Sequence, residues 1–585
     1  MQNGRTVGAL SELFLTRAAR TLAAGALALS SVGAVAAPLL AAPLMVGCAD
    51  ENDPKTWVSR LDDPSQRPAA IKRLSAFFED TMTKATKNRD DASVKALLDV
   101  AVDPLTKTYV SVALDEKTRK ELIKLLADMR DPRTTPAIAK AFSEYEPGKN
   151  DDDVKFASQA ATGLANAGKL TDKAVIDSLW ACFVKFHVSQ AKSINLVTDL
   201  HDAVLAVKDP SYGPKAVERL AAPVDPNVPD QVMDQTNFWQ QTSVQIISEL
   251  KFAPAARSLV LLLLTPSKAA LRAPANAALM KMPQAAEPLL IAALKGTDPE
   301  FAKLSLLFED KSAVAVIGDS LSWLSRPAGK AAILDALAAA ENDTNRTVLA
   351  QSLIHFPADP TLVKAFLDAY GKLAPNASIV LLRGANARGV LTGASAHLYQ
   401  GNLTDWLVKE MLAAKGDAAD ELQLHALESA INLMQASQLS KVEETVNKFA
   451  APREKEMFKV ASGIVKQCQS DAKCYVGVLD KAVASDQGTA AEAPVKAAWM
   501  AAEYGAGNAA IRGALVDKID GVKAPGIRLA VAEAIDALAP QGDTAAADKL
   551  DKMVAADKLK NDRAVLQGDD AVVKVVNRLR ARALP

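Results

Sequence analysis

Histidine, the side chain that most often serves metal and acid–base chemistry, is scarce in this sequence. The chain has 585 residues but only five histidines, which are His187, His201, His355, His397 and His425. No two of them are three or four residues apart, the spacing that would place two ligands of a zinc or iron site on one face of a helix. We therefore expect no metal site and no cofactor, and we interpret each histidine as a surface or half-buried structural residue.

One serine stands in a context that could support nucleophilic catalysis. The segment Val314–Leu321 reads VAVIGDSL and resembles the first block of GDSL-type hydrolases, in which a strand leads into a turn that carries the nucleophilic serine. The resemblance would make Ser320 the nucleophile, which also needs a histidine base and oxyanion donors. The family's Asp-x-x-His block is absent, and its Gly-x-Asn-Asp block is matched only by Ala340–Asp343. We keep a serine hydrolase as an alternative and favour a helix from Ser312 to Trp323.

Two further patterns suggest ligand binding but have simpler interpretations. The segment Gly163–Leu170 nearly fits a phosphate-binding P-loop, with Leu170 in place of the hydroxyl residue that holds Mg²⁺. A P-loop follows a strand and opens a helix, whereas the preceding segment has a helical period, so we predict a turn between helices. The acidic clusters Asp151–Asp153 and Asp569–Asp570 lack the spacing of a calcium-binding loop. We interpret them as solvated turns and helix caps.

The cysteines predict a disulfide between Cys468 and Cys474. The intervening Gln469–Asp471 reads as a turn, with Asp471 capping a following helix, and such a turn brings the two sulfur atoms into bridging range. The bond would join two consecutive helices and stabilise the fold by roughly 2–3 kcal/mol. A redox-active pair is the alternative, but the spacing is not Cys-x-x-Cys and nothing nearby would lower the pKa of a thiol. Cys182, within an apolar run, is a predicted core residue.

The first 49 residues have the order of an export signal. Three arginines precede 29 uncharged residues, from Thr21 to Ala49, and Pro38 and Pro43 interrupt this run. The run is long enough to span a bilayer. The prolines and the small residues near its end favour a cleaved signal peptide instead.

The end of this run, Leu44–Cys48, resembles a bacterial lipobox, in which a small residue precedes a cysteine that is acylated and becomes the new N-terminus. Cys48 and the glycine before it fit the pattern, while Met45 stands where leucine is usual. The resemblance implies a signal peptide of residues 1–47, lipidation of Cys48 and attachment on the periplasmic side of the bacterial envelope, at the outer rather than the inner membrane. Ordinary secretion with cleavage after Ala36 and a retained membrane anchor are the alternatives.

The elements that would position any such residues are predicted to be helices. The hydrophobic fraction of 49% excludes wholesale disorder. Aromatic residues make up only 5% of the chain, and a strand-rich protein would contain more of them. The net charge is −1, from 68 Lys+Arg and 69 Asp+Glu, so the chain has no basic footprint for nucleic acid. We expect no nucleic-acid partner.

From Trp57 onward one pattern recurs, in which two amphipathic segments are joined by a short polar turn. An example is Leu122–Met129, a turn over 130–136 and then Ala137–Phe142. The turns often contain Asp-Pro. Because aspartate is a good N-cap and proline suits the first helical position, we interpret Asp-Pro as marking helix starts. The pairs begin at residues 53, 63, 103, 131, 209, 225, 298 and 359.

The spacing of these segments predicts a helical repeat array. We expect second helices to start near residues 136, 171, 212, 254, 287, 328, 360, 404, 440, 473, 508 and 543. Intervals of 32 to 44 residues are typical of an α-solenoid. The turn at Asp131–Arg133 with the Pro136–Ala137 helix entry resembles bacterial HEAT-like repeats, and the resemblance covers nearly all of 55–585. It implies an all-α superhelix of roughly 12–14 hairpins. Tetratricopeptide repeats are the main rival, but their regular spacing is not kept.

We divide the mature chain into N-terminal repeats (48–222), central repeats (223–395) and C-terminal repeats (396–585). The segment Pro223–Asn237 reads as a long loop, and the glycine-rich Arg383–Ser395 reads as a flexible link. Either could contact a partner or bend the array.

These predictions together indicate a non-catalytic envelope protein. Its HEAT-like surface would bind a protein or peptide, and the lipid on Cys48 would hold it at the membrane. A GDSL-type hydrolase around Ser320 and an envelope assembly factor or chaperone are the alternatives. The expectation rests on architecture and not on a recognised site.

Overall fold

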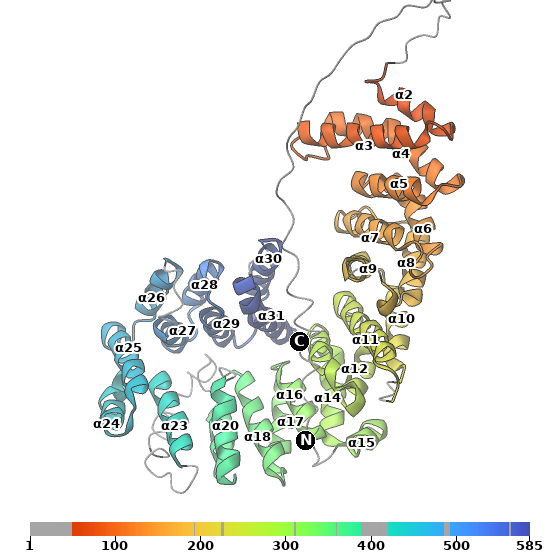
Figure 1. Ribbon diagram of the computed structural model, residues 1–585. Coiled ribbons are helices and arrows are strands. Elements are labelled where there is room, and N and C mark those ends of the chain that lie inside the picture. The colour runs from red at the N-terminus through yellow and green to blue at the C-terminus, as the bar shows by residue number, and fades with distance from the viewer. Residues whose placement is uncertain are drawn as a thin grey trace, which may run out of the picture. The chain divides into compact units, whose positions relative to one another are not determined.

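A computed structural model describes residues 50–584 of the chain, apart from 192–193, 224–226, 309–311, 358–359, 388–408, 410–418, 485–491 and 561–562. The predicted signal peptide 1–47 and Cys48 lie outside the described residues. Residues Asp53–Pro585 form one compact unit, which is shown in Figure 1.

The described elements are α-helices and short 3-10 helices, so the predicted all-α class is confirmed. Most of the helices alternate along the chain between two layers, which we call the A helices and the B helices. The A helices are α3(Arg67–Lys84), α5(Glu116–Met129), α7(Asp151–Asn166), α9(Ile194–Val207), α11(Asp230–Leu250), α13(Arg272–Met280), α16(Ala313–Ser322), α18(Asp343–Ser352), α20(Pro375–Ala387), α23(Ala419–Leu433), α25(Pro452–Cys468), α27(Glu492–Tyr504), α29(Pro525–Ala537) and α31(Arg563–Ala583).

The B helices follow the A helices in sequence and complete the hairpins. They are α4(Ala92–Ser111), α6(Thr135–Ser143), α8(Lys173–Lys185), α10(Tyr212–Ala221), α12(Ala256–Leu263), α14(Pro283–Lys295), α17(Pro327–Ala338), α19(Pro360–Tyr370), α24(Leu439–Phe449), α26(Ala472–Ala484), α28(Ala509–Lys518) and α30(Thr544–Lys560). Two short helices, α2(Pro54–Ser59) and α15(Pro299–Ser305), lie outside this alternation.

The observed B helices begin close to the predicted starts. From α6 to α19 they begin at residues 135, 173, 212, 256, 283, 327 and 360, and from α24 onward at 439, 472, 509 and 544. The start predicted near residue 404 lies outside the described residues. The repeat spacing read from the sequence is therefore confirmed over the described hairpins.

Packing within each layer makes the array a solenoid. Successive A helices pack on one another from α3 to α13 and again from α16 to α31, and B helices pack similarly, for example α6 on α8 and α12 on α14. Each hairpin thus buries its apolar faces against its neighbours in the sequence, as in other helical repeat arrays.

The pattern changes between α13 and α16. Here α16 packs on α14 and α18, whereas α13 packs on α31, the last helix of the chain. Figure 1 shows α31 (dark blue) beside the middle helices of the array (green). The helices from α13 to α31 therefore form a closed circuit, which the sequence spacing does not predict.

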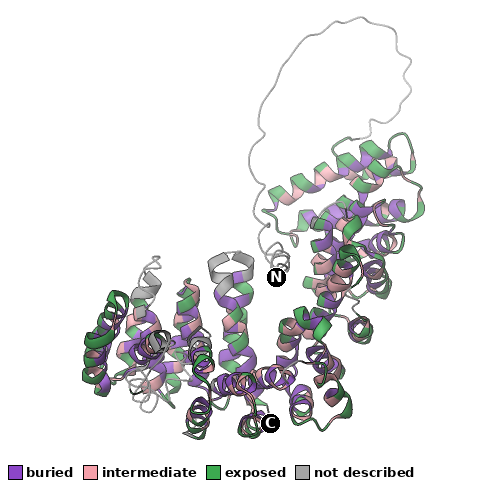
Figure 2. Cartoon of the chain, turned by 60° about the horizontal axis from the view of Figure 1, so that its bottom comes forward, coloured by how far each residue is buried: buried purple, intermediate pink, exposed green. Residues whose placement is uncertain are grey.

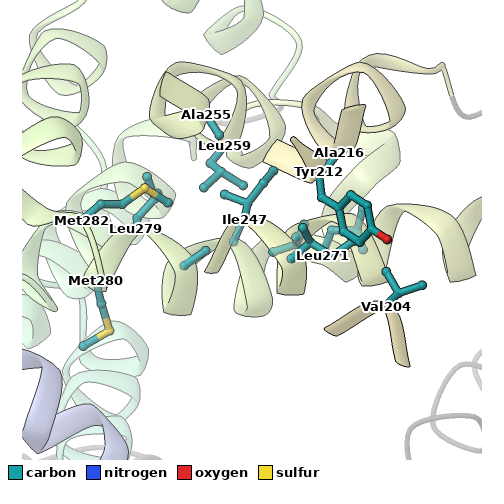
Figure 3. Close-up of a cluster of buried hydrophobic side chains, with 14 of the residues drawn as sticks. Val204, Tyr212, Ala216, Ile247, Ala255, Leu259, Leu271, Leu279, Met280 and Met282 are labelled. Atoms are coloured by element: carbon teal, nitrogen blue, oxygen red, sulfur yellow. The ribbon is translucent and has the colours of Figure 1, made fainter. Parts of the chain in front are cut away.

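Alanine and aliphatic side chains fill the space between the layers, and Figure 2 shows the buried residues where helices meet. Figure 3 shows one such cluster, which includes Tyr212 of α10, Ile247 of α11 and Leu259 of α12. The core is continuous across residue 223 and separates into two clusters between Ala461 and Ile464. The domain limits at 222 and 395 remain an interpretation of the sequence.

The interpretation of Asp-Pro as a helix start is confirmed at some sites and wrong at others, including Asp63-Pro64, which lies in a turn before α3 begins at Arg67. Asp53 and Asp298 cap α2 and α15 with their carboxylates, and proline follows at the first helical position. Asp103-Pro104, in contrast, lies inside α4. The backbone bond that Pro104 cannot donate is lost there, but packing of the apolar face of α4 keeps the helix continuous.

The predicted long loop over Pro223–Asn237 is wrong for its second half. Helix α11 begins at Asp230, directly after Pro229. Buried Gln235 ties the second turn of this helix to the end of α8, because its side chain donates to the Phe186 carbonyl (2.8 Å) and accepts from the Val188 amide (2.7 Å). Likewise, the first residues of the predicted link 383–395 belong to α20, and the rest lies outside the described residues.

Candidate functional site

Ser320 lies in the interior of α16 and not on a strand-to-helix turn. Its side chain is buried, and its hydroxyl donates to the carbonyl of Val316 one turn earlier, at 2.8 Å. This bond holds the oxygen against its own helix. The predicted helix from Ser312 to Trp323 is confirmed, with α16 spanning Ala313–Ser322.

The segment that nearly fits a P-loop closes a helix instead of opening one. Helix α7 ends at Asn166, and Gly168 adopts a left-handed φ of 66°. The amide of Lys169 donates to the Leu164 carbonyl at 2.9 Å. These amides therefore satisfy the last carbonyls of α7, the usual role of a glycine-terminated helix end.

The described histidines are separated from one another. His187 is exposed, the His201 ring donates from Nε2 to the side-chain oxygen of Gln245 (2.5 Å), and buried His355 stacks on Trp323 with ring centroids 4.0 Å apart. His397 and the side chain of His425 lie outside the described residues. Within the described part of the chain, no group of three His, Cys, Asp or Glu side chains could hold a metal ion.

Cys468 and Cys474 are joined by a disulfide in the structure, with their Cα atoms 5.4 Å apart. Cys468 ends α25, and Asp471 accepts from the Lys473 amide at the start of α26 (2.9 Å), so the bond links two consecutive helices. Cys182 is buried in α8, and burial raises the pKa of its thiol. The predicted lipidation site Cys48 lies outside the described residues.

The interpretation of the acidic clusters as solvated caps is wrong for three of their members. Asp151 and Asp153 are buried, and Asp153 forms an ion pair with Arg119 (2.8 Å) and accepts a hydrogen bond from the Tyr109 hydroxyl (3.1 Å). Burial raises the pKa of both Asp153 and Tyr109. Asp569 is buried beside Arg528, 2.7 Å away. Because these partners come from other helices, the local sequence gives no signal for them.

The A helices of the N-terminal half carry a series of exposed polar contacts from one helix to the next, which we call the A-face row. It begins with Lys120 of α5 and Asp152 of α7, 2.6 Å apart. It continues with Gln159 of α7, which donates to Asp199 of α9 at 2.9 Å. The row then passes from His201 of α9 to Gln245 of α11.

The A-face row ends in a cluster of three charges. Glu249 of α11 lies 3.2 Å from Lys208 and 2.9 Å from Lys281, which follow α9 and α13 respectively. Exposed ion pairs of this kind contribute little to stability. Together they place polar and charged side chains on successive A helices from α5 to α13, and this row is our candidate functional site.

The joints between neighbouring repeats share another feature, in which a buried or half-buried Lys or Arg caps the C-terminal end of a nearby helix. Lys140 donates to the Val110 carbonyl at the end of α4 (2.7 Å), and Lys496 donates to the Asn432 (2.6 Å) and Met434 (2.7 Å) carbonyls at the end of α23. The last carbonyls of a helix lack intrahelical hydrogen-bond donors and carry partial negative charge. A Lys or Arg side chain both donates hydrogen bonds to these carbonyls and is attracted by their charge.

The same capping recurs along the array. The other cations that cap in this way are Arg89 on α5, Lys268 on α10, Arg272 on α12, Arg326 on α31, Arg512 on α29 and Arg528 on the short helix η9(Ile519–Gly521). Sequence reasoning missed these residues, because each acts on a helix whose position only the tertiary fold decides.

Two large apolar side chains are prominent on the surface. Leu306 and Leu307, which follow α15, are 85% and 60% exposed. Phe308 separates them from the segment 309–311, which lies outside the described residues.

Comparisons with known proteins add little to this picture. No family model and no curated protein matches the chain. Among solved structures, the chain is similar to a homology model of the full-length AP-3 complex in an intermediate open conformation, with 12% sequence identity, a TM-score of 0.24, and coverage of 91% of this chain and 92% of that chain. A likeness this distant carries no argument about function, and the α-solenoid class rests on the helices themselves.

Among the described residues, no helix is both long and apolar enough to cross a membrane.

Proposed function

We propose that this protein is a non-catalytic scaffold of the bacterial envelope, which binds a protein or peptide through its helical array and is held at the membrane by a lipid on Cys48. The observation that carries the binding role is the A-face row. It extends one polar surface over successive A helices, and repeat arrays use such extended surfaces to bind proteins. The anchoring role rests on the lipobox-like Leu44–Cys48 segment alone.

The A-face row suits a partner with polar and charged side chains. Positively and negatively charged side chains alternate along its described members. Lys120 lies beside Asp152, and Glu249 lies between two lysines. Surface pairs of this kind can exchange their internal contacts for contacts with a partner at small cost, because each pair is solvent-exposed and weak. We therefore expect binding that weakens as the salt concentration rises.

The test is a crosslinking pull-down from native envelopes with a matched pair of variants. The A-face variant carries Lys120→Glu, Gln159→Lys and Gln245→Lys. The control variant carries three exposed substitutions on the B helices α8 and α10, namely Lys173→Glu, Asp177→Lys and Glu218→Lys. Circular dichroism first establishes that both variants keep the helical content of the wild-type protein.

We expect the A-face variant to lose the crosslinked partner at least tenfold and the control to retain it. Equal recovery by both variants would refute the assignment of the binding surface to the A helices. If the wild-type protein captures nothing beyond a bead-only control, the scaffold proposal itself fails.

Anchoring is tested separately by mass spectrometry of the native N-terminus. The proposal expects an acylated Cys48 as the first residue, and release of a Cys48→Ala variant from the membrane fraction. An unmodified start at Met1, or cleavage after Ala36, would contradict the lipid anchor. The binding role would be unaffected by that result, because the pull-down tests it separately.

A further inference from the structure

The closed circuit of helices is completed where α31 packs on α13 and where the C-terminal end of α31 meets the start of α17. Arg326 precedes α17 and donates from Nη1 to the carbonyls of Ala581 (2.7 Å) and Leu584 (3.2 Å) at the end of α31. Its Nε donates to Oε2 of buried Glu287 in α14, at 2.8 Å. The other oxygen of Glu287 accepts the Gly329 amide in the first turn of α17 (3.0 Å).

Glu287 therefore fixes the direction of the Arg326 guanidinium independently of α31. Both side chains are nearly buried, at 10% and 12% exposed. A guanidinium held by a carboxylate on one edge presents its remaining donors in a fixed geometry. At this joint those donors point at the unsatisfied carbonyls of a helix end, to which the negative end of the helix dipole adds attraction.

Trp323, at the end of α16, contributes an aromatic face to the same joint. Lys574 and Arg578 of α31 lie over its ring, at 4.8 and 5.5 Å from the centroid, and His355 stacks on it. Such cation–π contacts favour docking of a basic helix on this corner. Arg582 adds a hydrogen bond to the Ser325 hydroxyl at 3.3 Å.

The joint differs from the other cation-capped joints in its sequence separation. Arg326 and Ala581 are 255 residues apart, whereas the partners in the other joints are at most 64 residues apart. Neighbouring repeats remain tethered when one contact breaks. The joint at Arg326 has no such tether in the nearby sequence, because α31 is held to this corner by the contacts with α13, Trp323, Ser325 and Arg326 described above.

We infer that the corner formed by Glu287, Trp323 and Arg326 is a docking site for the C-terminal end of a basic helix, that α31 of the same chain occupies it, and that the array opens and closes at this joint. The inference is independent of the proposed membrane anchor and of the partner of the A-face row. Opening would expose the corner and the end of α31 together.

The test uses two double variants that neutralise equivalent ion pairs. The joint variant is Glu287→Gln with Arg326→Gln, which removes the buried charges together and keeps an acceptor for the Gly329 amide. The control is Arg512→Gln with Asp543→Asn at the joint between α28 and α29. There Arg512 is held by Asp543 (2.7 Å) and donates to the Leu538 carbonyl (3.0 Å).

The control matches the joint variant in detail, because Asp543 also accepts an amide, that of Ala546, in the first turn of α30 (2.9 Å). Small-angle X-ray scattering measures the radius of gyration, and hydrogen exchange reports on residues 323–329 and 574–584. We expect the joint variant to raise the radius of gyration and to speed exchange in these two segments at least tenfold, with the other helices unchanged. The control should speed exchange only near residues 534–546 and keep the wild-type radius of gyration.

An unchanged radius of gyration in the joint variant would overturn the inference. So would faster exchange throughout α16–α18 and α29–α31, because the joint would then belong to the cooperative core. Should the joint variant fail to fold, Lys574→Gln, which removes an exposed cation over Trp323, replaces it. That variant must then shift exchange in the same two segments, and wild-type exchange in both would equally refute the inference.

Discussion

Lys496 and Glu503 form a buried ionisable pair in α27. The Lys496 ammonium is enclosed between α23 and α27 and donates to two carbonyls at the end of α23. Burial lowers the pKa of Lys496 to about 7 and raises the pKa of Glu503 to about 7. The Gln435 amide donates to Glu503 at 2.7 Å, which completes a polar cluster inside the array. Charge at this cluster therefore changes near neutral pH.

The pair predicts a minimum in its contribution to stability near pH 7. The folded pKa of Glu503 is raised above its ordinary value of 4.5, so its contribution is present below pH 4.5 and is lost as the pH rises through about 7. The folded pKa of Lys496 is depressed below 10.5, so its contribution is present above pH 10.5 and is lost as the pH falls through about 7.

Thermal unfolding at pH 5, 7 and 9 measures both contributions. The wild-type midpoint minus that of Glu503→Gln should fall between pH 5 and 7, and the wild-type midpoint minus that of Lys496→Met should rise between pH 7 and 9. Neutralising the exposed Lys459–Glu456 pair of α25, 3.4 Å apart, serves as the control and should give a flat difference. Flat differences for the buried pair would show that neither group changes charge in these windows.

At the scale of elements, cationic capping of helix ends joins the repeats. Lys268, in the short helix η5(Pro266–Leu271), is 9% exposed and donates to the carbonyls of Leu220 and Ala222 at the end of α10. The Gln240 amide also donates to Ala222, at 2.9 Å. The Leu220 carbonyl therefore depends on Lys268, while Ala222 has a second donor.

We expect Lys268→Met to lower the free energy of unfolding by about 1–3 kcal/mol, because methionine fills the space but leaves a buried carbonyl unsatisfied. Urea denaturation followed by circular dichroism measures the change. The matched control is Lys303→Met on α15, which removes an exposed lysine and should change the free energy by less than about 0.5 kcal/mol. A loss of similar size in both variants would argue against capping as the cause.

At the scale of the whole array, the apolar core separates into two clusters, one from Leu61 to Ala461 and one from Ile464 to Leu579. Repeat arrays unfold in steps when the coupling between neighbouring parts is weaker than the stability of each part. The two core clusters adjoin each other within α25. The joint at Arg326 connects them at another place, because α17 belongs to the first cluster and the end of α31 belongs to the second cluster.

We therefore expect the wild-type protein to unfold in two steps as the urea concentration rises, one for each core cluster. Hydrogen exchange measured at each urea concentration monitors the unfolding. The Glu287→Gln, Arg326→Gln variant should move the step of residues 464–579 to lower urea, while the step of residues 61–461 serves as the internal reference. A single transition that includes both clusters in wild type and variant would show that the core boundary at residues 461–464 does not limit cooperativity.

The local sequence was sufficient to predict the hairpins. Helix periodicity, capping aspartates such as Asp298 and the spacing of the turns are properties of neighbouring residues, so the starts of the B helices and the helix containing Ser320 could be predicted without a fold. The turn between Cys468 and Cys474 is equally local, and the structure contains the disulfide that this turn allows.

The residues that join the array could not be predicted in this way. Asp153 and Asp569 read as solvated acids because their arginine partners, Arg119 and Arg528, lie on other helices. Arg326 reads as an ordinary turn residue, and its role depends on a helix end 255 residues away.

The class of fold, the repeat spacing and the local turns can thus be predicted from neighbouring residues, since periodicity and capping act within a few residues. Folding of the whole chain is needed to establish which charges are buried, which helix ends they cap and where the array closes. Burial and the electrostatics of a helix end depend on distances between segments, and those distances exist only in the folded chain.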